Sequence, residues 1–210
     1  MPISTTIAGI ARRVPFYRGM RRKIELDRLR KKIAASNPLN VVIGGGETVY
    51  ESWIGTDRDF LDVTNPDDWR TLFRANSIDR LLCEHVLEHL THAQAATAVR
   101  ECHRFLKPGG LLRIAVPDGF RRDAVYVAEA APPNDGHQVF YNIHSLTALL
   151  TSAGFSVAPL EYFDEAEEFH AAPWDEREGM IIRSVRFDQQ QKFRRGDLYY
   201  TSLIVDARKN

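Results

Sequence analysis

Short apolar runs alternate along the chain with segments that repeat apolar residues at helical spacing. Runs of strand length lie at Leu39–Ile43, Trp53–Thr56, Ile78–Cys83, Leu111–Val116, Phe155–Phe163 and Tyr199–Ala207. Helical segments are predicted at Pro66–Arg74, about Thr91–Leu106, and His144–Ala153. Strands that alternate with helices pair in parallel through right-handed crossovers. The pattern therefore predicts an α/β fold, with helices on both faces of a mostly parallel sheet.

The stretch from Leu39 to Asp62 carries the strongest local signal. A strand leads into three consecutive glycines at positions 44–46, and a second short apolar piece ends at Asp57. Glycines let the backbone approach a ligand closely, and an acid at the tip of the next strand accepts hydrogen bonds from ribose hydroxyls. This arrangement is typical of a site for an adenosine-type cofactor. Asp57 follows the turn by only about a dozen residues rather than about twenty, which argues against an ordinary NAD-binding fold.

Charge is distributed unevenly, although the 210 residues carry 28 basic and 28 acidic side chains. Residues 1–36 hold ten Lys and Arg against two acids, a net charge of +8, and the remainder carries −8. Residues 7–35 are predicted to form a basic amphipathic helical arm ahead of a main domain, residues 37–210. Either the arm packs on the acidic domain and covers its cleft, or it attaches to an anionic membrane surface or a partner. Nucleic-acid binding is not expected, because no basic and aromatic patch recurs elsewhere.

Size and composition are those of an ordinary soluble domain with room for a sizeable core. No apolar run approaches the roughly 18 residues of a membrane span, and the N-terminal apolar segment is too short for a secretion signal. Cys83 and Cys102 fall in elements predicted to be buried, so we expect free thiols of a reducing compartment. The expected location is the cytoplasm, with the inner face of the membrane as an extension. Residues 164–197 are polar and irregular and are predicted to form an insertion or flap.

Three phrases of the sequence resemble class I S-adenosylmethionine-dependent methyltransferases. They are VLEHL (residues 86–90), RFLKPGGLLRIAVPD (residues 104–118) and LLTSAGF (residues 149–155). With the text EGMIIRSVRFD and YYTSLIVDARK near the C-terminus, the likeness covers about residues 39–208 and is greatest to small methyltransferases associated with glycan and polysaccharide synthesis. It implies a three-layer α/β/α Rossmann-like domain, with a doubly wound, mostly parallel seven-stranded sheet whose last strand is antiparallel. It also implies S-adenosyl-L-methionine as cofactor and O-methylation of a sugar or glycan intermediate.

The resemblance assigns the cofactor to specific residues. Gly44 and Gly46 would bracket its methionine and ribose portion, and Asp57 would hold the ribose diol. Asp62, with Val63 beside it, would sit at the adenine and accept from the exocyclic amine.

Two further positions follow from the resemblance, and one departs from it. Glu84 and His85 lie just past the third strand, where the family lines the methyl-transfer cleft. Glu47 replaces the usual third glycine of the turn, and an acid there could repel the cofactor carboxylate. Glu47 therefore keeps a rival function open, in which a non-catalytic protein of this fold acts as a binding or scaffold module through its basic arm.

Methyl transfer to a hydroxyl needs a positioned acceptor and a base. His137 follows the predicted fifth-strand loop and is the first candidate for the base, because histidine titrates near neutrality. Glu84 and His85 complete the catalytic candidates, and Tyr141 and His144 are alternatives for the base.

One motif points to a different chemistry. Residues 85–89 match the H-x-x-E-H pattern of inverted zinc proteases. That motif needs a longer helix and a third ligand, and the sequence shows neither. We therefore expect no metal and rank a zinc hydrolase third among the functions.

Overall fold

The computed structural model describes residues 22–45, 50–188 and 202–210. The chain divides into two compact units, Met1–Asn37 and Pro38–Asn210. In the first unit residues 22–35 are helical, and the rest of the predicted arm lies outside the described residues. None of the described helices is both long and apolar enough to cross a membrane.

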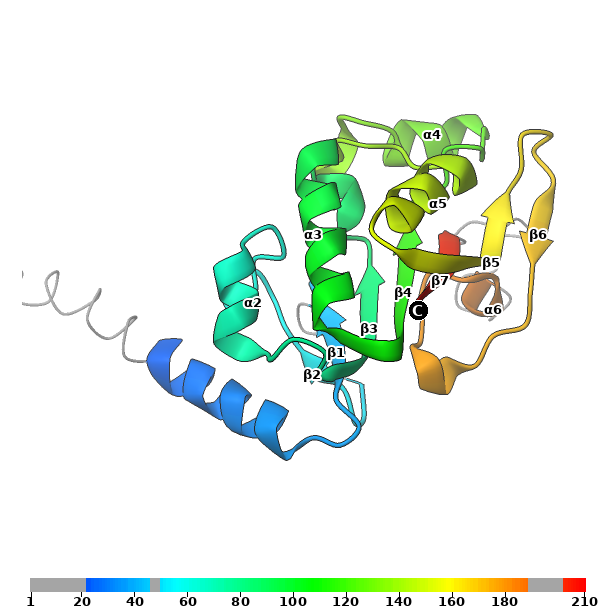
Figure 1. Cartoon of the computed structure of the whole chain (residues 1–210). Coiled ribbons are helices and arrows are strands. Elements are labelled where there is room, and N and C mark those ends of the chain that lie inside the picture. The colour runs from blue at the N-terminus through cyan, green and yellow to red at the C-terminus, as the bar shows by residue number, and fades with distance from the viewer. Residues whose placement is uncertain (1–21, 46–49, 189–201) are drawn as a thin grey trace, which may run out of the picture. The chain divides into compact units, whose positions relative to one another are not determined.

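The second unit is built on a seven-stranded sheet in the order β2-β1-β3-β4-β7-β5-β6 (Figure 1). The strands are β1 (Asn40–Ile43), β2 (Ile54–Gly55), β3 (Ile78–Glu84), β4 (Leu106–Val116), β5 (Phe155–Phe163), β6 (Phe169–Ala171) and β7 (Leu203–Lys209). β1 pairs in parallel with β2 and β3, and β3 with β4. β7 runs antiparallel between β4 and β5, and β6 runs antiparallel to β5. The prediction of a mostly parallel seven-stranded sheet with an antiparallel last strand is confirmed.

Two details of the sheet differ from what the pattern of apolar residues predicts. β4 begins at Leu106 rather than Leu111, and its register against β3 shifts between Ile78 and Arg80. The extra residues are accommodated because Gly109 takes a φ of +76°. β6 comes from the segment predicted only as an insertion, where Glu161, Tyr162 and Phe163 of β5 pair with it in a hairpin.

The helices of this unit begin at side chains that suit a helix start. α2 (Pro66–Leu72) is capped by Asn65, and α3 (His92–Phe105) and α5 (Ile143–Ser152) each start with a capping box. α4 (Ala124–Ala130) and α6 (Val185–Asp188) are shorter, and the 3₁₀ turns are η1 (Leu87–His89), η2 (Asn134–Gly136) and η3 (Glu176–Glu178). The three predicted helices are present within two residues of their expected limits.

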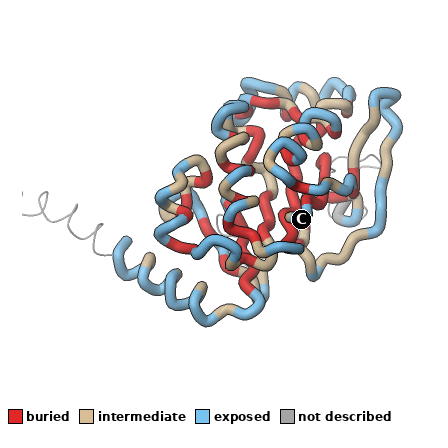
Figure 2. Tube along the Cα trace, viewed as in Figure 1, coloured by how far each residue is buried: buried red, intermediate tan, exposed pale blue. Residues whose placement is uncertain are grey.

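Apolar side chains pack on both faces of the sheet. Trp69 of α2 and Phe105 of α3 are both buried, and their rings stack at a centroid separation of 5.4 Å. Another cluster joins strand residues with Ile181 and the partly buried Trp174, from the segment that follows β6. Buried residues therefore follow the strands and the helix sides that cover them (Figure 2).

The parallel strands β1, β2, β3 and β4 end at one edge of the sheet. The chain moves outward from β1 to β2 and then crosses back to β3 on the other side of β1. This reversal is a topological switch point, where open α/β sheets leave a crevice for ligands. The glycine turn after β1 and residues 84 and 85 at the end of β3 lie on its two sides.

Candidate active site

Gly44 occupies a position that only glycine fits. Its φ is +63°, and a Cβ atom added there would lie 2.5 Å from Cγ2 of Val86. The next amide, Gly45 N–H, donates to the carbonyl of Thr56 at 3.0 Å, which ties the turn to the end of β2. The glycine turn is therefore shaped by the close approach of the segment after β3. Gly46 and Glu47 lie outside the described residues.

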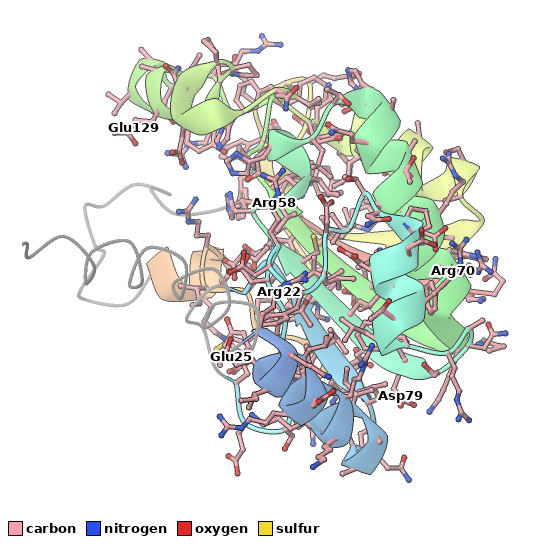
Figure 3. The ribbon with its side chains drawn as sticks, turned by 90° about the vertical axis from the view of Figure 1, so that its left-hand side faces the viewer. Arg22, Glu25, Arg58, Arg70, Asp79 and Glu129 are labelled. Carbon is pink, nitrogen blue, oxygen red and sulfur yellow. The ribbon has the colours of Figure 1, made fainter. Side chains whose placement is uncertain are left out.

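A cavity of about 330 Å³ opens beside this turn, toward the end of β2. Its volume lies in the range of about 300–1,000 Å³ that is usual for small-molecule sites. Five of the predicted cofactor residues line it: Gly44, Asp57, Asp62, Val63 and His85. Arg58 also lines it, and Figure 3 shows Arg58 toward the carboxyl ends of the strands, away from Asp79 at their amino ends.

The two acids of this cavity differ in their surroundings. Asp57 is exposed, and its Oδ1 accepts from the Arg58 amide at 2.6 Å. Asp62 is half-buried, and its Oδ1 accepts from the hydroxyl and the amide of Thr64 at 2.6 and 2.9 Å. The Thr64 hydroxyl is the main reason that the pKa of Asp62 is lowered. Asp62 is thus held as a carboxylate, the form that accepts from an amine.

A smaller cavity of about 250 Å³ lies on the other side of the turn. Glu84, Tyr50, Ile182 and Arg183 line it together with His85 and the first two glycines. The carboxylate of Glu84 accepts from the amides of Arg183 and Ile182 at 2.8 and 3.2 Å. Burial, and then the charge of Glu84, raises the pKa of Tyr50 to about 12, so its hydroxyl stays protonated.

His85 lines both cavities and lies where they meet. Its φ of +54° is unusual for a residue with a side chain. Nε2 lies 2.9 Å from the Ser202 hydroxyl, and Nδ1 lies 3.2 Å from Nη1 of Arg183 and 2.7 Å from Oε1 of Glu88. The ring is therefore held in part by side chains that come from the far C-terminal part of the chain.

His137 lies in a different environment from the one that the sequence suggests. It is buried, and its Nδ1 lies 2.7 Å from the carbonyl of Ala130. Its ring meets that of His89 edge to face at 4.8 Å between centroids. It lines neither of the two cavities above, so its role as base stays a prediction.

The other candidates take mainly structural contacts. Tyr141 is buried, and burial followed by the charge of Glu88 raises its pKa to about 12. His144 is exposed in the first turn of α5 and lies 3.0 Å from Glu165. Trp174 donates from Nε1 to Glu161 at 2.8 Å.

Three other polar side chains in the C-terminal half, His170, Arg121 and Arg122, also contact protein groups. The His170 ring stacks on that of Tyr162. Arg121 lies over the Tyr126 ring, and Arg122 lies 3.4 Å from Glu167.

Sequence reasoning missed the residues from the C-terminal half that complete the site. Arg183 and Ile182 reach Glu84 across 99 and 98 positions. The phrase EGMIIRSVRFD, residues 178–188, contains both and was the available signal, because it belongs to the text that resembles the methyltransferases.

Two comparisons with known proteins point to methyltransferases. The family described as "Methyltransferase domain" matches residues 58–114. A probable S-adenosylmethionine-dependent methyltransferase of Mycolicibacterium smegmatis is 33% identical over 132 residues, which cover 53% of this chain and 49% of that protein. Over the matched residues the chain is similar to S-adenosylmethionine-dependent methyltransferases. It matches about half the length of this curated relative.

A solved methyltransferase structure shares the fold, and a second was also found to be similar. A methyltransferase from Mesorhizobium loti has a TM-score of 0.50 and 13% identity, with 87% of this chain and 96% of that chain covered. One from Archaeoglobus fulgidus has a TM-score of 0.46 and 16% identity, with 90% and 94% covered. The matched family and the curated relative both point to S-adenosylmethionine as the cofactor.

Proposed function

We propose that this protein transfers a methyl group from S-adenosylmethionine to a hydroxyl of a sugar or glycan intermediate. The observation that carries the proposal is the pair of cavities that meet at Gly44 and His85, with Asp57 and Asp62 on the larger one. The polyhydroxy acceptor rests on the likeness of the C-terminal text to glycan-associated methyltransferases and on the polar lining of the smaller cavity.

The residues of the larger cavity fit the adenosine part of the cofactor. Asp57 accepts from the ribose diol and Asp62 from the adenine amine, while Val63 supplies an apolar surface. Gly44 lines this cavity without a side chain, so a ligand can approach its backbone closely. The cofactor supplies an electrophilic methyl group on a sulfonium.

The smaller cavity suits the acceptor end of the site. Glu84, Tyr50 and Arg183 offer it acceptor and donor groups of both charge signs. A neutral histidine can take a hydroxyl proton. His85 borders this cavity, whereas His137 lines neither cavity but lies against His89, which lines the larger one. The two histidines are proposed as alternative proton acceptors.

Calorimetric titration with S-adenosylmethionine and S-adenosylhomocysteine tests the cofactor site first. Asp57→Ala should weaken binding by about 1–3 kcal/mol, because hydrogen bonds to a charged acceptor are lost. Asp59→Ala is the matched control, since Asp59 is exposed, two residues away, and does not line the cavity. Equal affinity in both variants would remove Asp57 from the site. No binding by the folded wild-type protein would favour the scaffold function.

The proton acceptor is tested by turnover on whichever sugar the acceptor screen identifies. His85→Asn keeps the positive φ, which Asn tolerates. If His85 is the base, kcat of His85→Asn should be roughly 10²–10⁴-fold lower than that of the wild type. His137→Ala should lower kcat to this extent only if His137 is the base, while its affinity for the cofactor stays unchanged. Full activity in both variants would assign the step to another group.

A further inference from the structure

Three potential metal ligands converge behind the wall of the larger cavity. Glu88 and His89 end the 3₁₀ turn η1 after β3, and His137 follows η2. One donor atom from each lies within 4.8 Å of the other two. The backbone holds the two segments together, because the amides of Gln138 and Val139 both donate to the Glu88 carbonyl, at 2.7 and 3.2 Å.

The Glu88 carboxylate is the anomaly in this cluster. The residue is fully buried, and neither carboxylate oxygen has a hydrogen-bond partner. Its nearest titratable neighbour is His85, whose Nδ1 lies 2.7 Å from Oε1. A buried carboxylate without hydrogen bonds is costly, so buried charges are normally paired or coordinate metals. Among the described residues, Glu88 therefore has one ion-pair contact, from Oε1 to His85, and its Oε2 has no hydrogen-bond donor.

His137 is prepared to act as a ligand. A carbonyl oxygen can only accept, so the 2.7 Å contact with Ala130 places the ring proton on Nδ1. The lone pair is then on Nε2. A metal-ligating histidine almost always donates its other N–H to a carbonyl or carboxylate in this way.

We propose that Glu88, His89 and His137 bind one divalent transition-metal ion of the zinc type. Two imidazole nitrogens and one carboxylate oxygen are donors that zinc accepts. Zinc bonds of about 2.0–2.2 Å place neighbouring donors roughly 3.3–3.6 Å apart in a tetrahedral site. A donor pair at the 4.8 Å limit would therefore need to come closer by about 1.2–1.5 Å, which side-chain rotations can supply. Three protein ligands leave a fourth position for water.

The site borders the cofactor crevice, since His89 also lines the larger cavity. A bound ion would fasten the end of β3 to the loop after η2 and stiffen that wall. The proposal does not depend on methyl transfer. An ion bound at Nε2 of His137 would occupy its free lone pair, so His85 would then be the proton acceptor. The proposal reverses the expectation of no metal. The sequence did not suggest the site, because the third ligand, His137, lies 48 positions beyond His89 and only the fold brings it near.

A second group of possible ligands, Asp164, Glu168 and His170, does not carry the same argument. It lies at the β5–β6 hairpin, where Asp164 already accepts from two backbone amides and lies 2.7 Å from His170. Its carboxylate has the partners that Glu88 lacks.

The test is a calorimetric titration of untagged, chelator-treated full-length protein with Zn²⁺, and an absorption titration with Co²⁺. We expect one ion per chain, a dissociation constant in the micromolar range or tighter, and the visible spectrum of tetrahedral Co²⁺. His137→Ala and Glu88→Gln should weaken binding at least tenfold. His92→Ala, an exposed histidine three positions after His89, is the control and should bind like the wild type.

Two readouts guard against a variant that does not fold. His89→Ala changes a half-buried residue and should also lose the ion, with the fold checked by circular dichroism. The zinc K-edge X-ray absorption spectrum of the zinc-loaded wild type should be fitted best with two imidazole ligands. No stoichiometric binding, or equal binding by wild type and His137→Ala, would overturn the proposal and leave Glu88 neutralised by a proton or by His85.

Discussion

At the scale of single residues, the site depends on one glycine that two separate effects make irreplaceable. Gly44 has a positive φ, and it also faces Val86 too closely to carry a side chain. The first effect costs an ordinary residue about 1–2 kcal/mol, and the second adds a steric clash. The chain offers a way to separate them, because Gly109 has φ of +76° with nothing within 4 Å of an added Cβ.

We predict that Gly44→Ala destabilises the protein more than Gly109→Ala and also weakens cofactor binding. Gly109→Ala should lower the free energy of unfolding by about 1–2 kcal/mol, the conformational cost alone. Gly44→Ala should exceed this value, and adding Val86→Ala should recover part of the difference. Urea unfolding measures the stabilities. Equal losses in the two single variants would mean that the contact with Val86 relaxes freely.

At the scale of elements, Asp118 joins the end of β4 to the end of β5. Its Oδ2 accepts from the Phe163 amide at 2.7 Å and its Oδ1 from the Phe120 amide at 2.9 Å. Burial nevertheless raises the pKa of Asp118 to about 6. The folded state therefore holds this proton more tightly than the unfolded chain does. The protonated carboxyl contributes to the stability of the fold below about pH 4, and this contribution is lost as the pH rises through about 6.

We predict a pH-dependent difference between the wild type and Asp118→Asn. The raised pKa corresponds to about 3 kcal/mol, lost by the wild type between roughly pH 4 and 7, and an amide does not ionise. The stability of the wild type relative to the variant should therefore fall over this interval. Urea unfolding at a series of pH values measures both proteins. A relative stability that rises with pH would contradict the assignment.

At the scale of the whole molecule, the two units differ in charge. The first 36 residues carry +8 and the remainder −8. Each basic residue near an anionic surface contributes about 1 kcal/mol to attraction, and salt screens that attraction. This charge distribution supports the proposal of peripheral membrane contact through residues 7–35.

We predict that the full-length protein co-sediments with phosphatidylserine vesicles at low salt and is released at high salt. Vesicles of phosphatidylcholine alone are the matched control and should retain little protein. A variant with Arg22, Lys23 and Arg28 changed to Glu should lose most of the binding. Binding that is equal for both kinds of vesicle, or unaffected by salt, would exclude electrostatic attachment.

Local patterns were enough to predict most elements and to pick out residues that line the larger cavity. Gly44, Asp57 and Asp62 lie within 19 positions of one another, so a strand, a turn and a second strand place them with few alternatives. The helices at α2, α3 and α5 were predicted for a similar reason, because periodicity and caps act over a few residues.

The sequence by itself determined the α/β class, the glycine turn and the acids that face it. Tertiary structure alone decided the other wall of the site. Inserting β7 between β4 and β5 brings Ser202 to His85, and the segment after β6 brings Arg183 to Glu84. The same folding joins His137 to Glu88. These contacts span 49 to 117 positions, and no local propensity encodes them, because they depend on the order in which the strands pair.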